Sequence, residues 1–209
     1  MSIEQVGNSD IMYLSIIGWT FVQKAEDTTP WAKKREYETS DWKTGVKWEI
    51  PYKNLSGKLS KMMFKDSDYG EQFVLELVDG KETYHITMWT DSRYFADFAK
   101  KLPNINLAED FELNPFDFKT KEGKQLRWMS IKQDWTKVES YYWDAEKKKT
   151  LHKMPEVSKE DAKGYDKDDW KMFFIKVKKF LKAEVEKVEL EEITAEVVDE
   201  VFADETVPF

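Results

Sequence analysis

The sequence predicts a mainly β fold with added helices. Five strand-like segments lie between residues 58 and 133, and a helix-like segment falls between the third and fourth of them. A second helix-like segment lies nearer the C-terminus. Three meander strands, one helix and two strands is the element order of the OB-fold, a five-stranded Greek-key barrel. We therefore expect an OB-fold-like barrel with one helix after the third meander strand and a C-terminal amphipathic helix.

The N-terminal quarter predicts strands on either side of a polar excursion. Residues 14–22 are rich in β-branched and aromatic side chains, which favours a strand. Residues 24–45 are polar and predict a long loop or a β-excursion. Apolar and charged residues alternate over 46–52, which is typical of a strand with one buried face.

The next stretch predicts a β-meander. Its three strands are expected at 58–65, 73–78 and 83–89. Turn residues separate them, most clearly Asp79-Gly80, which is a strong hairpin signal. The alternation of the first strand breaks at Met62-Met63, and this break indicates a β-bulge.

The first helix is predicted at 91–102. Asp91 or Ser92 can cap its N-terminus, and Pro103 ends it. Its apolar side chains recur at helical spacing, as Tyr94, Phe95, Phe98 and Leu102.

The remaining predicted elements are two strands, a short further strand and a helix. The strands are expected at 110–119 and 125–133, joined by a turn at 121–124. Residues 137–143 suggest a short further strand, and an apolar stripe predicts an amphipathic helix at 168–188.

Charge divides the chain into a body and a tail. Residues 183–209 hold ten acidic residues and one Lys, a net charge of −9, whereas residues 1–182 carry +1. The near-neutral body can carry local basic patches that the overall charge of −8 conceals. The expected organisation is an OB-fold-like nucleic-acid-binding body with an N-terminal extension at 1–145, a charged linker at 146–167, the amphipathic helix at 168–188 and an acidic partner-binding tail at 189–209.

The sequence offers no catalytic or cofactor-binding motif. Cysteine is absent, the two histidines, His85 and His152, lie far apart, and no phosphate-binding loop, nucleophile elbow or zinc-protease motif occurs. We expect no enzyme, no cofactor and no metal. The N-terminus lacks signal-peptide features, and no apolar run approaches the roughly 20 residues of a membrane span. These features favour a soluble protein of the cytoplasm.

Basic and aromatic residues are interleaved in two segments, 43–65 and 119–137. Proteins that bind single-stranded nucleic acid combine cations that follow the phosphates with aromatic rings that stack on the bases. Trp128 shares a strand face with Ser130 and Lys132, opposite Met129 and Ile131, so this Trp is expected on the polar face. The candidate nucleic-acid-binding residues are Trp31, Lys34, Arg35, Trp42, Lys58, Lys61, Lys65, Trp89, Lys121, Lys124, Arg127, Trp128, Lys132 and Trp135.

The C-terminus predicts a partner-binding element. The acidic tail ends in apolar residues, with a Phe at the terminal carboxylate. A ring that fills a pocket, beside acids that meet basic residues, makes a docking element. An ordinary solvated acidic tail is the alternative. The candidate partner-binding residues are Asp204, Glu205, Val207, Pro208 and Phe209.

The ending DETVPF is similar to the tail tips of bacterial single-stranded DNA-binding proteins. With the OB-like element order, the chain resembles a phage-type member of this class. The resemblance implies a non-enzymatic protein that coats single-stranded DNA in replication, recombination and repair, in the cytoplasm of the host cell. It also implies that the tail recruits replication or recombination proteins and competes with DNA for the basic surface. Residues 1–45 and 168–188 depart from the bacterial pattern, which leaves the oligomeric state open.

The sequence is also compatible with three other functions. A carbohydrate-binding module on an OB-like barrel would explain the tryptophans but not the lysines or the tail. A metal-dependent nuclease would need ligands that the sequence does not single out. A non-enzymatic scaffold could dock a partner through the 168–188 helix and the tail.

Overall fold

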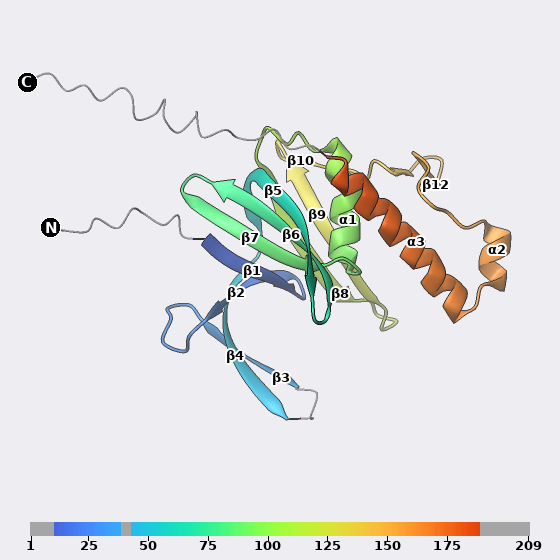
Figure 1. Cartoon of the computed structure of the whole chain (residues 1–209). Helices are drawn as coiled ribbons and strands as arrows, with labels where there is room; N and C mark the ends of the chain where they lie inside the picture. The colour runs from blue at the N-terminus through green and yellow to red at the C-terminus, as the bar shows by residue number, and fades with distance from the viewer. Residues whose placement is uncertain (1–10, 39–42, 189–209) are drawn as a thin grey trace, which may run out of the picture.

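The computed structural model describes residues 11–38 and 43–188. Ten of its strands are β1 (Ile11–Ile17), β2 (Thr20–Ala25), β3 (Lys33–Glu38), β4 (Thr44–Tyr52), β5 (Leu55–Ser67), β6 (Gly70–Asp79), β7 (Glu82–Trp89), β8 (Phe111–Lys119), β9 (Gln125–Gln133) and β10 (Thr136–Lys137). They form one mixed sheet in the order β10-β9-β8-β5-β6-β7-β1-β2-β4-β3 (Figure 1). The prediction of a mainly β fold with added helices is confirmed.

The centre of the sheet is the predicted meander. β5, β6 and β7 pair as antiparallel neighbours, and β8 returns to pair with β5. The spatial order β8-β5-β6-β7 is that of a Greek key. The predicted bulge is present in β5, but it lies between Leu59 and Lys61 rather than at Met62-Met63.

A closed five-stranded barrel is not shown. The edge of β7 that β6 leaves free is occupied by β1, which runs parallel to β7. β2, β4 and β3 then extend the sheet beyond β1. The sequence did not reveal this pairing, because it joins strands that are about 70 residues apart in the chain.

The prediction of one strand at 14–22 is wrong. The segment forms parts of β1 and β2, which pair as a hairpin through a turn at Gly18-Trp19. Gly18 has φ +58°, a backbone conformation that glycine adopts without steric cost. The expected β-excursion at 24–45 contains β3 and the start of β4, and these two strands form a ribbon that projects from the sheet (Figure 1).

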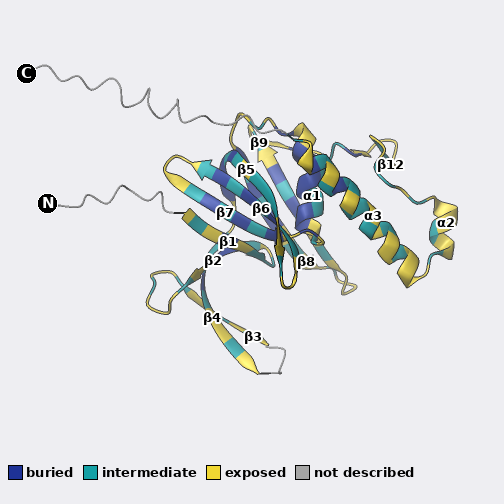
Figure 2. Cartoon of the chain, in the orientation of Figure 1, coloured by how far each residue is buried: buried dark blue, intermediate teal, exposed yellow. Residues whose placement is uncertain are grey.

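The core lies between the meander and the helix α1 (Arg93–Lys101). Alternate residues of β6 and β7, among them Phe73 and Ile86, are fully buried, as their pattern predicts (Figure 2). The ring of Phe73 lies 5.2 Å from that of Phe95 and 5.7 Å from that of Phe98 on α1. The Ser92 hydroxyl accepts a hydrogen bond from the Phe95 N–H and so caps the helix.

Buried polar groups join α1 to β9. The Asp97 carboxylate accepts from the Met129 N–H at 3.2 Å, and the Lys101 ammonium donates to the Met129 carbonyl. Burial raises the pKa of Asp97 and lowers the pKa of Lys101. A short 3-10 helix, η1 (Leu102–Asn104), contains Pro103 and leads out of α1.

The segment 137–143 does not form the predicted strand. β10 pairs with the end of β9, and β11 (Trp143–Asp144) pairs instead with β12 (Lys149–Thr150) in a separate hairpin. Between them Tyr142 is buried in the core, which explains the apolar signal of this segment. The short helix α2 (Lys159–Gly164) lies within the stretch expected to be a linker.

The C-terminal helix α3 (Lys167–Glu186) matches the predicted amphipathic helix to within two residues. Leu181 and Val185 near its C-terminal end are buried in the core. Met172 and Phe174 near its N-terminal end are exposed. Only the C-terminal half of the predicted apolar stripe therefore packs on the body (Figure 2).

Candidate nucleic-acid interface

An aromatic cluster lies on the outer face of the β8–β9 hairpin. Met129 and Ile131 of β9 point into the core and are fully buried. Trp128 therefore points outward, as its place in the alternation predicts. Phe116 of β8 is its direct cross-strand partner, and Phe118 lies two residues further along β8 on the same face. We call Phe116, Phe118 and Trp128 the hairpin aromatic cluster.

The three rings pack on one another and still present surface to solvent. The Phe116 and Trp128 rings stack with centroids 4.9 Å apart and planes 10° apart. Phe118 meets Trp128 edge-on, with centroids 5.4 Å apart. Phe116 remains 36% exposed and Phe118 45% exposed. Rings held in this way can stack on further flat π-systems at little cost in side-chain entropy.

Sequence reasoning missed both phenylalanines of the cluster. They recur with a period of two in β8, in phase with Glu112 and Asn114 on the polar face of that strand. That phase was the available signal. The register of β8 against β9 was needed to place Phe116 beside Trp128.

Basic residues lie at the tip of the hairpin. Lys119 is the last residue of β8, and Lys121 and Lys124 lie in the turn that follows it. All three side chains are exposed. None of the three has an ion-pair partner among the described residues. They can therefore meet an anion without giving up a carboxylate.

Two predicted cations of β9 are already paired. On the outer face, the Lys132 Nζ lies 3.6 Å from Oε1 of Glu112. Arg127 lies on the opposite face from Trp128, where its Nε donates to Asp117 at 3.0 Å. The structure does not bring Arg127 onto the face of the hairpin aromatic cluster.

Three candidate lysines lie along β5. Ser56 pairs with Glu112, so the outer face of β5 continues that of β8. Lys58 follows on this face and is half-buried. Beyond the bulge, Lys61 and Lys65 are exposed and alternate with the core-facing side chains of the strand.

The candidates in the β3–β4 ribbon form a separate group. Arg35 donates two hydrogen bonds of 2.7 Å to the carboxylate of the buried Glu49, so the charge of Arg35 is neutralised within the ribbon. Lys34 pairs with Glu36 at 2.9 Å. Trp31 is exposed in the loop before β3, with φ +67°. Trp42 lies outside the described residues.

The last two tryptophans lie outside the hairpin aromatic cluster. Trp135 is 97% exposed in the turn after β9, at the end of that strand opposite to Lys121 and Lys124. Trp89 ends β7, is 40% exposed and lines a cavity. The partner-binding candidates at 204–209 lie outside the described residues.

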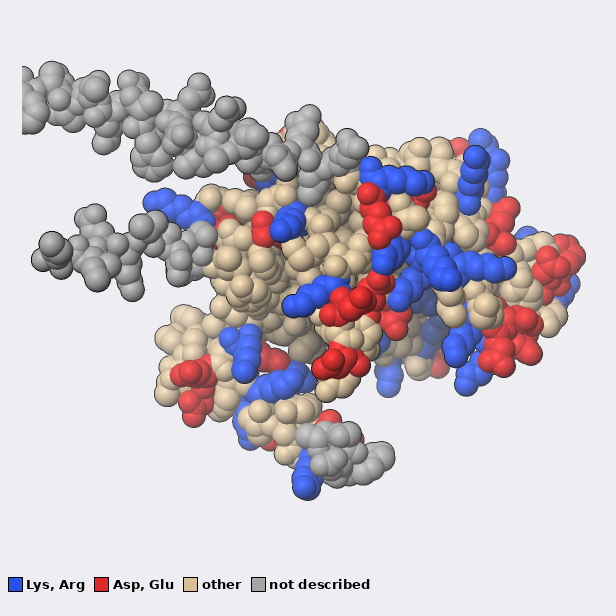
Figure 3. Space-filling model, in the orientation of Figure 1, with Lys and Arg blue, Asp and Glu red and all other residues tan. Residues whose placement is uncertain are grey.

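A basic surface that sequence reasoning did not single out lies on α3. Figure 3 shows Lys and Arg side chains gathered over this helix, with acidic groups beside them. Lys171, Lys176 and Lys179 of the helix are exposed. Lys182 is instead held by the Glu71 carboxylate of β6.

Within residues 11–38 and 43–188, no group of three or more His, Cys, Asp or Glu side chains is placed to hold a metal ion. No helix in the same part of the chain is long and apolar enough to cross a membrane. No protein-family model, no curated protein and no solved structure matches the chain.

Proposed function

We propose that this protein binds single-stranded DNA with little sequence preference, as a non-enzymatic factor in DNA replication, recombination and repair. The hairpin aromatic cluster, flanked by exposed lysines at the hairpin tip, is the observation that carries the proposal. Aromatic rings stack on any base, and each stacked base contributes roughly 1–3 kcal/mol. Lysines beside the rings neutralise the phosphates that accompany those bases.

The strand order supports the proposal of DNA binding, because it matches that of the OB-fold. We assign β5, β6, β7, β8 and β9 to strands one to five of an OB-like body, with α1 between strands three and four. OB-folds bind oligonucleotides with the face of strands two and three and with the loops that follow strands one and four. On this assignment the loop after strand four is the turn that carries Lys121 and Lys124.

The acidic tail is proposed as a partner-binding element that also competes with DNA. The chain beyond residue 182 carries −9 and is tethered to a body with exposed lysines. A tethered polyanion acts at a high effective concentration, and salt screens its attraction to the lysines. Asp204, Glu205, Val207, Pro208 and Phe209 would engage replication or recombination proteins in the cytoplasm of the host.

The test is a titration of the full chain with oligo(dT) of about 30 nucleotides, followed by intrinsic Trp fluorescence. Saturable quenching is expected, with weaker binding at about 300 mM than at about 50 mM NaCl. The same titration with duplex DNA and with a neutral oligosaccharide supplies the controls. Equal binding to the duplex, or binding to the oligosaccharide alone, would contradict the proposal.

A further inference from the structure

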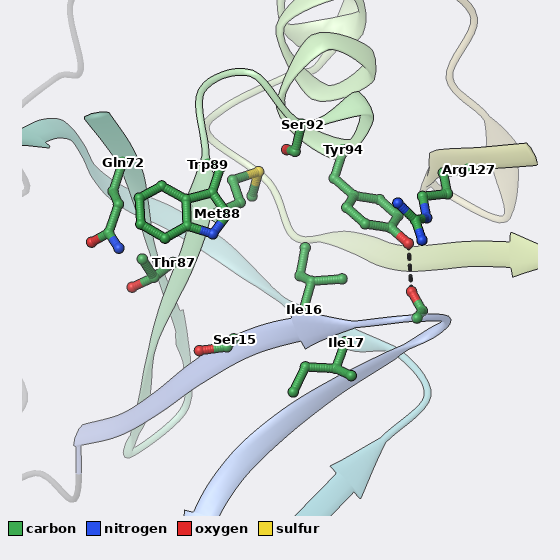
Figure 4. Close-up of a pocket in the computed structure, with 11 residues that line it drawn as sticks. Ser15, Ile16, Ile17, Gln72, Thr87, Met88, Trp89, Ser92, Tyr94 and Arg127 are labelled. Carbon is green, nitrogen blue, oxygen red and sulfur yellow. Dashed lines mark hydrogen bonds between the residues drawn. The ribbon is translucent and has the colours of Figure 1, made fainter. Parts of the chain in front are cut away.

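A cavity of about 420 Å³ opens between several elements of the fold. Its walls come from the β1–β2 hairpin, Gln72 of β6, the end of β7, the first turn of α1 and Arg127 of β9 (Figure 4). Its volume lies within the range of sites that hold small organic groups. The parallel pairing of β1 with β7 builds one wall.

The lining combines an apolar wall with a few polar groups. Ile16, Ile17 and Met88 supply the apolar part. Trp89 stands at the side of the cavity next to Gln72, with its indole ring partly exposed (Figure 4). Ser15, Thr87 and Gln72 also line the cavity and supply its polar side chains. A flat ring with polar edges fits such a lining, because indole stacks on its face and the polar groups meet its edge.

Arg127 provides a cation at the cavity with donors to spare. Its Nε donates to Oδ2 of Asp117, which fixes the guanidinium, and its side chain is 53% exposed. The Nη groups have no acceptor among the described residues. Asp117 Oδ1 is buried and has no hydrogen-bond partner in the described structure. A guanidinium positioned by one carboxylate can donate its remaining N–H groups to a phosphate.

Tyr94 fixes the β1–β2 turn on the Arg127 side of the cavity. Its hydroxyl donates to the Gly18 carbonyl in the β1–β2 turn, and Figure 4 shows this bond beside Arg127. Burial and the nearby Asp117 charge raise the pKa of Tyr94 to about 12, so the phenol keeps its proton. The cavity is therefore formed before any ligand binds.

We propose that this cavity holds one base of the bound single strand, stacked on Trp89, with the adjoining phosphate at Arg127. The inference rests on the proposed function and adds a defined subsite to it. Arg127 and its chain neighbour Trp128 point to opposite faces of β9. β10 pairs only with Lys132 and Gln133, and α1 bonds the backbone of Met129, so no described strand covers the edge of β9 beside Arg127. A strand that stacks on Trp128 can reach the cavity around that edge.

The experiment is photo-crosslinking of the full chain to oligo(dT) that carries one 5-iododeoxyuridine, with the attached peptides mapped by mass spectrometry. Halogenated bases crosslink to the aromatic rings that they stack on. We expect crosslinks at Trp89 in addition to the β8–β9 hairpin. Trp89→Leu should weaken oligo(dT) binding at least about fivefold. Trp143→Leu, which alters an exposed Trp of β11, is the matched control and should bind like the wild type.

The outcomes separate this inference from the proposed function. Crosslinks confined to residues 111–133, with wild-type affinity in Trp89→Leu, would overturn the subsite and leave single-strand binding intact. No binding to oligo(dT) would overturn both. Binding of the mononucleotide dTMP as tight as that of the oligonucleotide would overturn the subsite, because it would indicate a free-nucleotide site. Thr87→Val, which removes one polar group from the cavity, tests the same surface if Trp89→Leu fails to fold.

Discussion

Trp128 stacks on Phe116 across the β8–β9 hairpin, with ring planes only 10° apart. The two residues are direct cross-strand partners, and both project from the outer face of the hairpin. The pairing gives the aromatic cluster a fixed position beside the basic hairpin tip.

The lysines of the hairpin tip should set part of the salt dependence. Each cation that neutralises a phosphate of single-stranded DNA contributes about 0.7 to the slope of log K against log salt. Lys121→Ala with Lys124→Ala should reduce the slope in oligo(dT) titrations and weaken binding at low salt. Lys137→Ala is the control, because Lys137 pairs with Glu139 at 2.8 Å beyond the other end of β9. Equal slopes in both variants would exclude the hairpin tip from the interface.

Removing the end of the tail should not weaken DNA binding. A variant that lacks residues 201–209 loses two acids and the terminal Phe. It should bind oligo(dT) as tightly as the full chain or more tightly, with the largest gain at low salt, where the tail competes best. It should also lose any recruitment of replication proteins. A loss of DNA affinity on truncation would refute the competitor role.

α3 should contribute to the stability of the body. Leu181 on this helix is 1% exposed and belongs to the main core, so Leu181→Ala should cost about 2–5 kcal/mol of unfolding free energy. Phe174→Ala, on the half of α3 that does not pack on the core, should change stability much less. Urea unfolding followed by Trp fluorescence measures both. Equal effects would mean that α3 packs differently from the arrangement described.

The ion pair between Glu71 and Lys182 should make stability fall in acid. The hydrogen bond from Lys182 lowers the pKa of Glu71 in the folded protein below its ordinary value of about 4.3. The unfolded chain then binds a proton more readily than the folded one. The contribution is present above the ordinary pKa and is lost as pH falls through the lowered value.

Glu71→Gln isolates this contribution. The difference in unfolding free energy between wild type and variant should shrink as pH falls from about 6 to about 3. Burial raises the pKa of Asp97, so this residue makes the unfolding free energy change with pH in the direction opposite to that of Glu71. Asp97 is present in both proteins, so its effect cancels in the difference. A difference that stays constant over this range would show that Glu71 is not stabilised as a carboxylate.

Local pattern was enough to predict much of the body. The meander, α1 and the β8–β9 pair each show a regular alternation or a helical stripe, and the turn at Asp79-Gly80 has a strong local signal. The outward direction of Trp128 follows from the same alternation. Such features depend on neighbours within a few residues, which the sequence displays directly.

The missed features depend on contacts between distant segments. The parallel pairing of β1 with β7 and the cross-strand position of Phe116 need tertiary register. Arg35 looked like a free cation because Glu49, which neutralises it, lies 14 residues away. The turn at Gly18-Trp19 was hidden by the apolar residues on both sides, although Gly18 was a usable signal.

The most direct measurement is the affinity of Trp128→Leu for oligo(dT), followed by fluorescence anisotropy of a labelled strand. We expect Trp128→Leu to bind more weakly by about 1–3 kcal/mol, the contribution of one stacked base. Trp143→Leu, with an equivalent change at an exposed Trp of β11, should bind like the wild type, and thermal melts should show both variants folded. Wild-type affinity in a folded Trp128→Leu variant would contradict the claim that the hairpin aromatic cluster binds the strand.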